Sequence, residues 1–231
     1  MAGKRMKAAA SKVVKGKPYA LKDAVALLKE GAPKFNQTVD VAINLGIDPT
    51  QSDQMVRGVV PMPHGLGKTV KVAVFAKGDK VEAAKKAGAD IVGAEELADA
   101  IAKGEINFDV CIATPDMMGV VGKVAKILGP RGLMPNPKLG TVTPDVEKAV
   151  KAAKAGQVEF KVEKAGIIHA GVGKVGFGEK EISENVLSFI AAVKRAQPAG
   201  VKGNYIKKIS ISATMGPGIT LDLTEVLGLV A

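Results

Sequence analysis

Two stretches of the chain alternate apolar and polar residues with a period of two, which is typical of a β-strand with one buried face. In residues 38–45, Val39, Val41, Ile43 and Leu45 are expected to point inward. In residues 207–222, isoleucines alternate with serines, and the pattern resumes after residues 214–218, Thr-Met-Gly-Pro-Gly. Two glycines around a proline predict a tight, exposed turn that another molecule can approach closely. An ordinary hairpin loop explains this stretch equally well.

The sequence around these two strands predicts further helices and strands. Apolar residues at helical spacing predict helices at about 21–30 and at 179–195, the longest one. Alternating patterns predict strands at 54–60, 157–162 and 167–175. Residues 1–17 are expected to form a mobile basic arm, and residues 224–231 a short apolar tail.

The middle of the chain has a different pattern. Short apolar runs at 70–75, 90–92 and 110–112 predict buried strands. Helices are expected between and after them, at 80–87, 95–103, 117–128 and 146–155. Strands that alternate with helices of this length indicate βα crossovers and a parallel sheet.

The predicted fold class is therefore α/β, in the form of an α+β discontinuous domain with an inserted Rossmann-like α/β domain. Residues 1–66 and 157–231 would form the first domain, and residues 67–156 the insertion. The chain would pass between them through the Gly- and Pro-rich residues 61–67 and near Gly156. Two adjacent connections of this kind predict a hinge.

Charge and composition narrow the function. The net charge is +10, and residues 1–22 contain seven basic residues and no acidic one. This suggests a polyanion partner, most often nucleic acid, although a solvated tail that only aids solubility gives the same pattern. One cysteine and two histidines argue against disulfides and against most metal sites. No apolar run is long enough for a membrane span, so we expect a cytoplasmic protein without cofactor or metal.

Glycine-rich motifs do not support an enzyme. Glycines 171, 173, 176 and 178 match a dinucleotide fingerprint, but they lie outside the α/β region, so a glycine-rich loop or bulged strand is the better interpretation. Residues 67–69 resemble the end of a P-loop whose first glycine is replaced by Met62. No base–nucleophile pair suggests catalysis. The loop at 129–138, with three prolines and two glycines, either binds a ligand or packs on its own domain.

Eight motifs occur in order along the chain, and together they resemble the family of the first large-subunit ribosomal protein, "L-one", in its bacterial form. The resemblance covers essentially the full length. The motifs are KF with Thr38 (34–38), LGIDP (45–49), VRG (56–58), PHGLGK (63–68), ATPD (113–116), GPRGLMPNPK (129–138), IHA with Gly173 and Lys174 (168–174) and TMGP (214–217).

This resemblance implies a structural ribosomal protein with a discontinuous RNA-binding domain and a Rossmann-like insertion. It implies direct binding to large-subunit (23S) rRNA, a place in the mobile stalk near the exit site, and assistance in the release of deacylated tRNA. It also implies repression of translation through the mRNA of its own operon. The RNA-binding residues carried over from the family are Lys34, Phe35, Thr38, Gly166, His169, Lys174, Thr214, Met215 and Gly216.

Two other functions are compatible with parts of the sequence. An α/β enzyme or nucleotide-binding protein would need a well-formed phosphate loop at a strand–helix junction of the middle domain. A generic polyanion-binding protein would use only residues 1–17 and would bind RNA without regard to sequence. The sequence leaves open the nucleotides contacted, the angle between domains, the role of the loop at 129–138 and whether the arm orders on binding.

Overall fold

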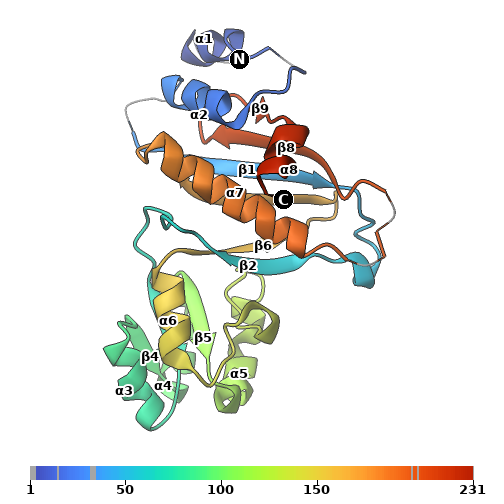
Figure 1. The fold of residues 1–231 in the computed structure, drawn as a ribbon. Helices are drawn as coiled ribbons and strands as arrows, with labels where there is room; N and C mark the ends of the chain where they lie inside the picture. The colour runs from blue at the N-terminus through green and yellow to red at the C-terminus, as the bar shows by residue number, and fades with distance from the viewer. Residues whose placement is uncertain (1–3, 15, 32–34, 199, 202, 231) are drawn as a thin grey trace. The chain divides into compact units, whose positions relative to one another are not determined.

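The computed structural model describes residues 4–14, 16–31, 35–198, 200–201 and 203–230 (Figure 1). By its internal contacts the chain divides into two compact units. Unit 1 contains residues 1–67 and 158–231, and unit 2 contains residues 68–157. The mixed α/β fold class predicted from the sequence is confirmed, with antiparallel pairing in the main sheet of unit 1 and parallel pairing in the sheet of unit 2.

Unit 1 is built around a four-stranded sheet with the order β7-β1-β8-β9. Strand β1 (Thr38–Leu45) lies in the interior of this sheet and pairs antiparallel with β7 (Ile167–Lys174) and β8 (Ile206–Ala213). The short strand β9 (Ile219–Thr220) follows on the outer side of β8. Strands that are far apart in the sequence are therefore neighbours in the sheet.

Alternation along β1 explains how the sheet meets its helices. Val39, Val41 and Ile43 are fully buried, as predicted, and belong to a core shared with α2 (Leu21–Glu30) and α7 (Glu179–Arg195). Helix α7 runs along this sheet in Figure 1 and also packs on β2 (Arg57–Pro61), which pairs with β6 (Gln157–Lys161). The bounds predicted for β1 and α7 are confirmed.

Two local predictions in unit 1 are wrong, and a third gains detail. Residues 1–17 are not simply a mobile arm, because Lys4–Ser11 form helix α1 from good helix formers such as Lys, Arg, Met and Ala. The second strand begins at Arg57 instead of Gln54, because Ser52–Gln54 form the 3-10 turn η1. The apolar tail is helix α8 (Leu223–Leu229), which begins where the side chain of Asp222 accepts a hydrogen bond from the Thr224 N–H.

Unit 2 is a small doubly wound α/β structure. Its parallel sheet has the order β4-β3-β5, with strands Ile91–Gly93, Val72–Phe75 and Val110–Ala113. Ala73 and Phe75 belong to a core with α4 (Glu95–Ala102) and α5 (Met118–Leu128), which follows the turn η2 (Pro115–Met117). Val72 and Val74 belong to a second core with α3 (Asp79–Lys86) and α6 (Val146–Lys154). All four residues of β3 are buried because helices cover both faces.

Candidate nucleic-acid interface

The main sheet of unit 1 has one open face. Opposite the buried residues of β1 lie Thr38, Asp40, Ala42 and Asn44, each of them partly exposed. Pairing with β1 places partly or fully exposed residues of both neighbouring strands beside them. We call this surface the open face; its members are Thr38, Asp40, Ala42 and Asn44 of β1, His169, Gly171 and Lys174 of β7, and Lys208, Ser210 and Ser212 of β8.

Three segments meet at one end of the open face, where β1 begins and β7 and β8 end. Thr38 pairs with Lys174, whose Nζ donates to the Thr38 Oγ1 at 2.8 Å. The backbone N–H of Thr214 donates to the Thr38 carbonyl at 3.2 Å. Thr38, Lys174, Thr214, Met215 and Gly216 therefore form one group, which we call the sheet-end cluster.

The turn at residues 214–216 is fixed through its backbone. Its Met215 N–H donates to Gln37 Oε1 at 2.6 Å, and its Gly216 N–H donates to the Ala213 carbonyl at 2.9 Å. On the other side, the Arg5 guanidinium donates to the Met215 carbonyl at 2.9 Å. The Met215 side chain is 54% exposed, so the turn presents an apolar group to solvent from a rigid backbone.

A second apolar side chain lies close to this end in sequence. Phe35 is 56% exposed and precedes Thr38 by three residues. Its neighbour Asn36 is held by the Gly176 N–H, which donates to Asn36 Oδ1 at 3.0 Å. Lys34, the remaining predicted residue of this segment, lies outside the described residues. An exposed phenylalanine and methionine beside hydroxyl groups can pack on a sugar or an unstacked base.

His169 and Gly166 lie away from the sheet-end cluster. His169 is exposed on the open face, where it pairs with Ala42, and its Nε2 is 3.8 Å from Glu163 Oε2. Gly166 is buried beyond the far end of β1, where its carbonyl accepts from the Leu45 N–H at 2.9 Å. Its φ of +74° suits a tight turn that glycine adopts without strain. The structure thus gives Gly166 a local role in the turn before β7.

Asp40 gives the open face an acidic group near its centre. Partial burial raises the pKa of Asp40, while the positive charges of Lys174 and, to a smaller degree, His169 act to lower it. Lys174 therefore faces both a hydroxyl and a carboxyl group. The open face thus offers hydroxyls, backbone groups and a few charges, and it is not uniformly basic.

Residues 27–217 of the chain match the model of the Ribosomal protein L1p/L10e family. The chain belongs to this family. Membership makes it a ribosomal protein of the large subunit, with a structural and non-enzymatic role, and implies binding to rRNA. All nine predicted RNA-binding residues lie within the matched part of the chain, whereas helix α1 lies outside it.

Several residues of the open face and the sheet-end cluster carry little signal in the sequence. Gln37 is almost fully buried and holds the turn through Met215, but its position before a predicted strand gave no hint of that contact. Arg5 was counted only as part of a basic arm. Asp40 and the serines of β8 occupied the polar positions of alternating strands, and that pattern was the one signal that pointed to them.

The glycine-rich segment begins within strand β7. Gly171 and Gly173 lie in β7, and the pairing register shifts opposite them, between Val39 and Asp40. The prediction of a glycine-rich loop or bulged strand is therefore confirmed, since in the described part of the chain no parallel βαβ unit surrounds these glycines. A Cβ at Gly171 would lie 3.1 Å from Thr38 Cγ2, so glycine permits close approach of the two strands.

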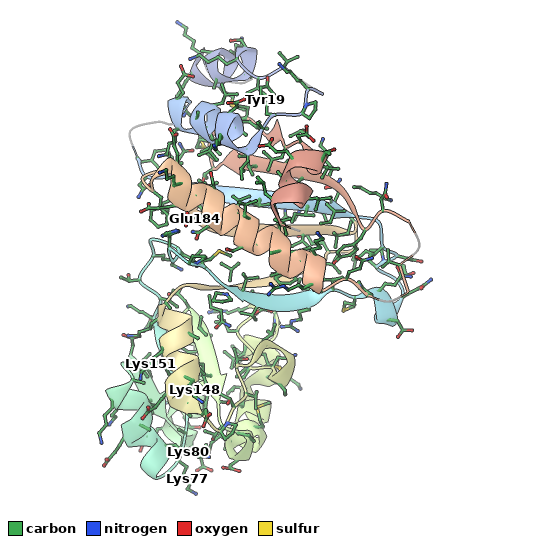
Figure 2. The ribbon with its side chains drawn as sticks, viewed as in Figure 1. Tyr19, Lys77, Lys80, Lys148, Lys151 and Glu184 are labelled. Carbon is green, nitrogen blue, oxygen red and sulfur yellow. The ribbon has the colours of Figure 1, made fainter. Side chains whose placement is uncertain are left out.

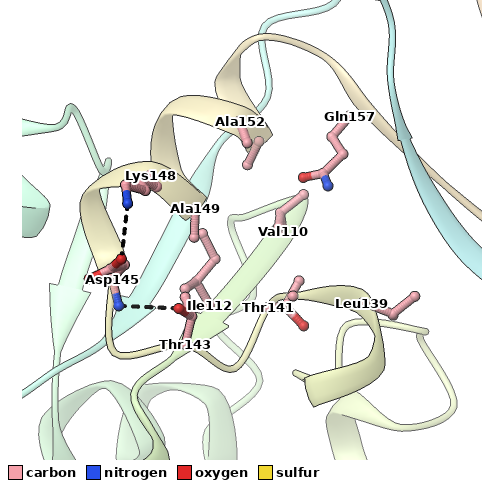
Figure 3. A pocket seen from close by; sticks show the side chains of 12 residues that line it. Val110, Ile112, Leu139, Thr141, Thr143, Asp145, Lys148, Ala149, Ala152 and Gln157 are labelled. Carbon is pink, nitrogen blue, oxygen red and sulfur yellow. Dashed lines mark hydrogen bonds and ion pairs between the residues drawn. The ribbon is translucent and has the colours of Figure 1, made fainter.

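Unit 2 offers less for a ligand. A cavity of about 280 Å³ lies between β5, the segment at 139–143 and α6 (Figure 3). Three of its polar residues pair with one another, because Thr143 Oγ1 accepts from the Asp145 N–H and Lys148 pairs with Asp145. The loop at 129–138 packs on its own unit through Leu133, which lies against the core beneath α4 and α5. Within the described part of the chain, no group of three or more His, Cys, Asp or Glu side chains could hold a metal ion.

One finding concerns membranes. Among the described residues, every helix is too short or too polar to span a bilayer.

Proposed function

We propose that unit 1 binds large-subunit (23S) rRNA directly through the open face and the sheet-end cluster. The observation that supports this most is the register of β7, β1 and β8, which gathers Thr38, Lys174 and the turn at 214–216 from three distant segments. With only 3% aromatic residues, the chain has few side chains for base-stacking platforms. Hydroxyls, backbone N–H groups and lysines on a shaped surface suit phosphates, 2′-hydroxyls and folded RNA instead.

The finer role follows from the family. We infer that the protein forms the mobile stalk near the exit site, assists the release of deacylated tRNA there, and represses translation by binding the mRNA of its own operon. In this proposal the rRNA and the mRNA use the same surface of unit 1, so each should displace the other. Unit 2 is the inserted domain, and it is not required for the primary contact.

The test is a variant with Thr214→Val and Met215→Ala. Thr214 is exposed and Met215 is 54% exposed, so the fold should tolerate both changes. Loss of a few desolvated contacts should weaken rRNA binding by about 1–3 kcal/mol, or roughly 5- to 150-fold. A matched control, Thr69→Val with Met134→Ala, makes the same changes at exposed sites of unit 2.

Filter-binding titrations would compare a stalk rRNA fragment with a shuffled RNA of equal length. Wild type should prefer the stalk fragment, the control should bind like wild type, and the site variant should lose most of the preference. The operon mRNA should compete with the stalk fragment for wild type. Unchanged affinity of the site variant would remove the sheet-end cluster from the interface.

A further inference from the structure

Helix α1 has a composition typical of an RNA-contacting element. It spans Lys4–Ser11, outside the residues that match the family model. Lys4, Arg5 and Lys7 are exposed, and the helix contains no acidic residue. None of its residues is buried, so hydrophobic packing does little to hold it. A helix of eight residues is marginal by itself in water, so its position depends on specific contacts.

Arg5 makes the contact that gives α1 its place. One nitrogen of its guanidinium donates to the Met215 carbonyl at 2.9 Å, and the other donates to the Gly31 carbonyl at 3.2 Å. Met215 belongs to the sheet-end cluster, and Gly31 follows the last residue of α2. The planar fork of an arginine can bridge two carbonyls in this way, which the single ammonium group of a lysine does less well.

Further contacts hold the helix and the segment after it. Lys12 forms an ion pair with Glu30 at the end of α2. Gly31 lies beside Ala9, since a Cβ built on Gly31 would be at van der Waals distance, 3.4 Å, from the Ala9 Cβ. Tyr19, labelled in Figure 2 beside the first two helices, accepts a hydrogen bond from the Val14 N–H through its hydroxyl at 2.9 Å. The basic helix is thus tied to the edge of the proposed interface.

We propose that α1 extends the RNA interface beyond the turn at 214–216 and contacts RNA phosphates there. Arg5 is the positioning residue, and Lys4 and Lys7 are the phosphate contacts. Neither lysine has a hydrogen-bond or ion-pair partner among the residues that the structure describes. This inference rests on the proposed function, because it takes the sheet-end cluster as the place where the RNA lies.

RNA fits this surface better than a membrane does. An interfacial helix needs a face of large apolar side chains, whereas the only such residue in α1 is Met6. A phosphodiester backbone needs closely spaced cations without competing acids, which Lys4 and Lys7 supply. The hydrogen bond from Arg5 to Met215 holds these lysines beside the sheet-end cluster, so one RNA can contact both.

The test is Lys4→Ala with Lys7→Ala, which keeps good helix formers at both positions. If each lysine contacts one phosphate, the slope of log K against log salt should become shallower by about 1.4–1.8. The variant should therefore lose most affinity for stalk rRNA at low salt. The ratio of wild-type to variant affinity should fall roughly tenfold from about 50 to about 200 mM salt. The matched control is Lys85→Ala with Lys86→Ala on α3, two exposed lysines of unit 2.

Arg5→Lys tests positioning separately, because it keeps the charge while weakening the bridge between the two carbonyls. It should lower affinity for the stalk fragment several-fold and lower the preference over shuffled RNA. Equal effects of the Lys4/Lys7 and Lys85/Lys86 variants would show that net charge alone acts, and would overturn the inference. Wild-type slope and affinity in the Lys4/Lys7 variant would overturn it as well, and wild-type behaviour of Arg5→Lys would refute the positioning role.

The titrations of the wild-type protein separate this inference from the proposed function. If wild type does not distinguish stalk rRNA from shuffled RNA, the proposed function fails. If wild type shows the preference and the Thr214/Met215 variant loses it, while the Lys4/Lys7 variant is unaffected, the proposed function stands and the role of α1 is wrong.

Discussion

The buried side chain of Asn185 makes three hydrogen bonds within unit 1, and its replacement by leucine should destabilise that unit strongly. The residue lies on α7 and is fully buried. Its side-chain nitrogen donates to the Val172 carbonyl at 2.8 Å and to the Gly65 carbonyl at 3.1 Å. Its oxygen accepts from the His64 N–H at 3.2 Å. One amide therefore joins α7, β7 and the segment that leaves β2.

The size of the effect follows from these three bonds. Each contributes about 1 kcal/mol net, and buried backbone groups left without a partner add a further penalty of about 1–3 kcal/mol. A leucine recovers roughly 1 kcal/mol through its apolar surface. We therefore expect Asn185→Leu to lower the free energy of unfolding of unit 1 by about 3–5 kcal/mol.

Tyrosine fluorescence in a urea titration measures this unit alone. The chain has two tyrosines, Tyr19 and Tyr205, both in unit 1, and no tryptophan. Asn204→Leu provides the control, since it makes the same change at an exposed position and should shift stability by less than about 0.5 kcal/mol. A loss below about 1 kcal/mol for Asn185→Leu would refute the argument that these buried bonds stabilise the unit.

Two further predictions concern the pH dependence of two aspartates and the replacement of two glycines by alanine. Hydrogen bonds from the Val72 N–H to Asp90, and from the Lys68 ammonium and the Lys71 N–H to Asp109, lower the pKa of each carboxyl below its ordinary 3.8. Their contribution to stability is therefore present above about pH 4 and lost as pH falls through the folded-state values. Acid should therefore speed the reaction of buried Cys111 with dithiodipyridine, because unit 2 opens more often. The double variant Asp90→Asn with Asp109→Asn should make this reaction rate depend less on pH. The same rate–pH profile in the variant and in wild type would contradict the prediction. Gly46→Ala would place a Cβ 2.3 Å from the Asn204 carbonyl oxygen and should cost about 3 kcal/mol in the tyrosine assay, whereas Gly228→Ala, with open space in α8, should be neutral or slightly stabilising.

Local pattern was sufficient for much of the secondary structure. The odd-numbered apolar residues of β1 matched its buried face, and the helical spacing in α7 matched its bounds, because each pattern is a direct consequence of one-sided burial. Helix α1 was missed because a run of cations without acids suggested disorder. Its position depends on the bond from Arg5 to Met215, which joins residues 210 positions apart and leaves no local signal.

The candidate site shows the same division. Turn chemistry pointed to residues 214–216, whereas Thr38 came only from the family resemblance. Their meeting depends on β1 lying between β7 and β8, a pairing order that hydrophobic alternation does not specify. The contact between Gln37 and Met215 depends on that order too. The RNA-binding roles of these residues stay predictions that the titrations above would test.

The interior position of β1 also has a consequence for how the chain is made. During synthesis β1 emerges early, and its partner strands β7 and β8 emerge only after all of unit 2. Unit 2 is contiguous in sequence and has its own cores, so it has what it needs to fold as soon as it leaves the ribosome. Until β7 and β8 emerge, the apolar face of β1 has no partner strands and can bind chaperones or pair with a wrong strand. Vectorial synthesis therefore favours unit 2 reaching its native structure first, while unit 1 waits for β7 and β8.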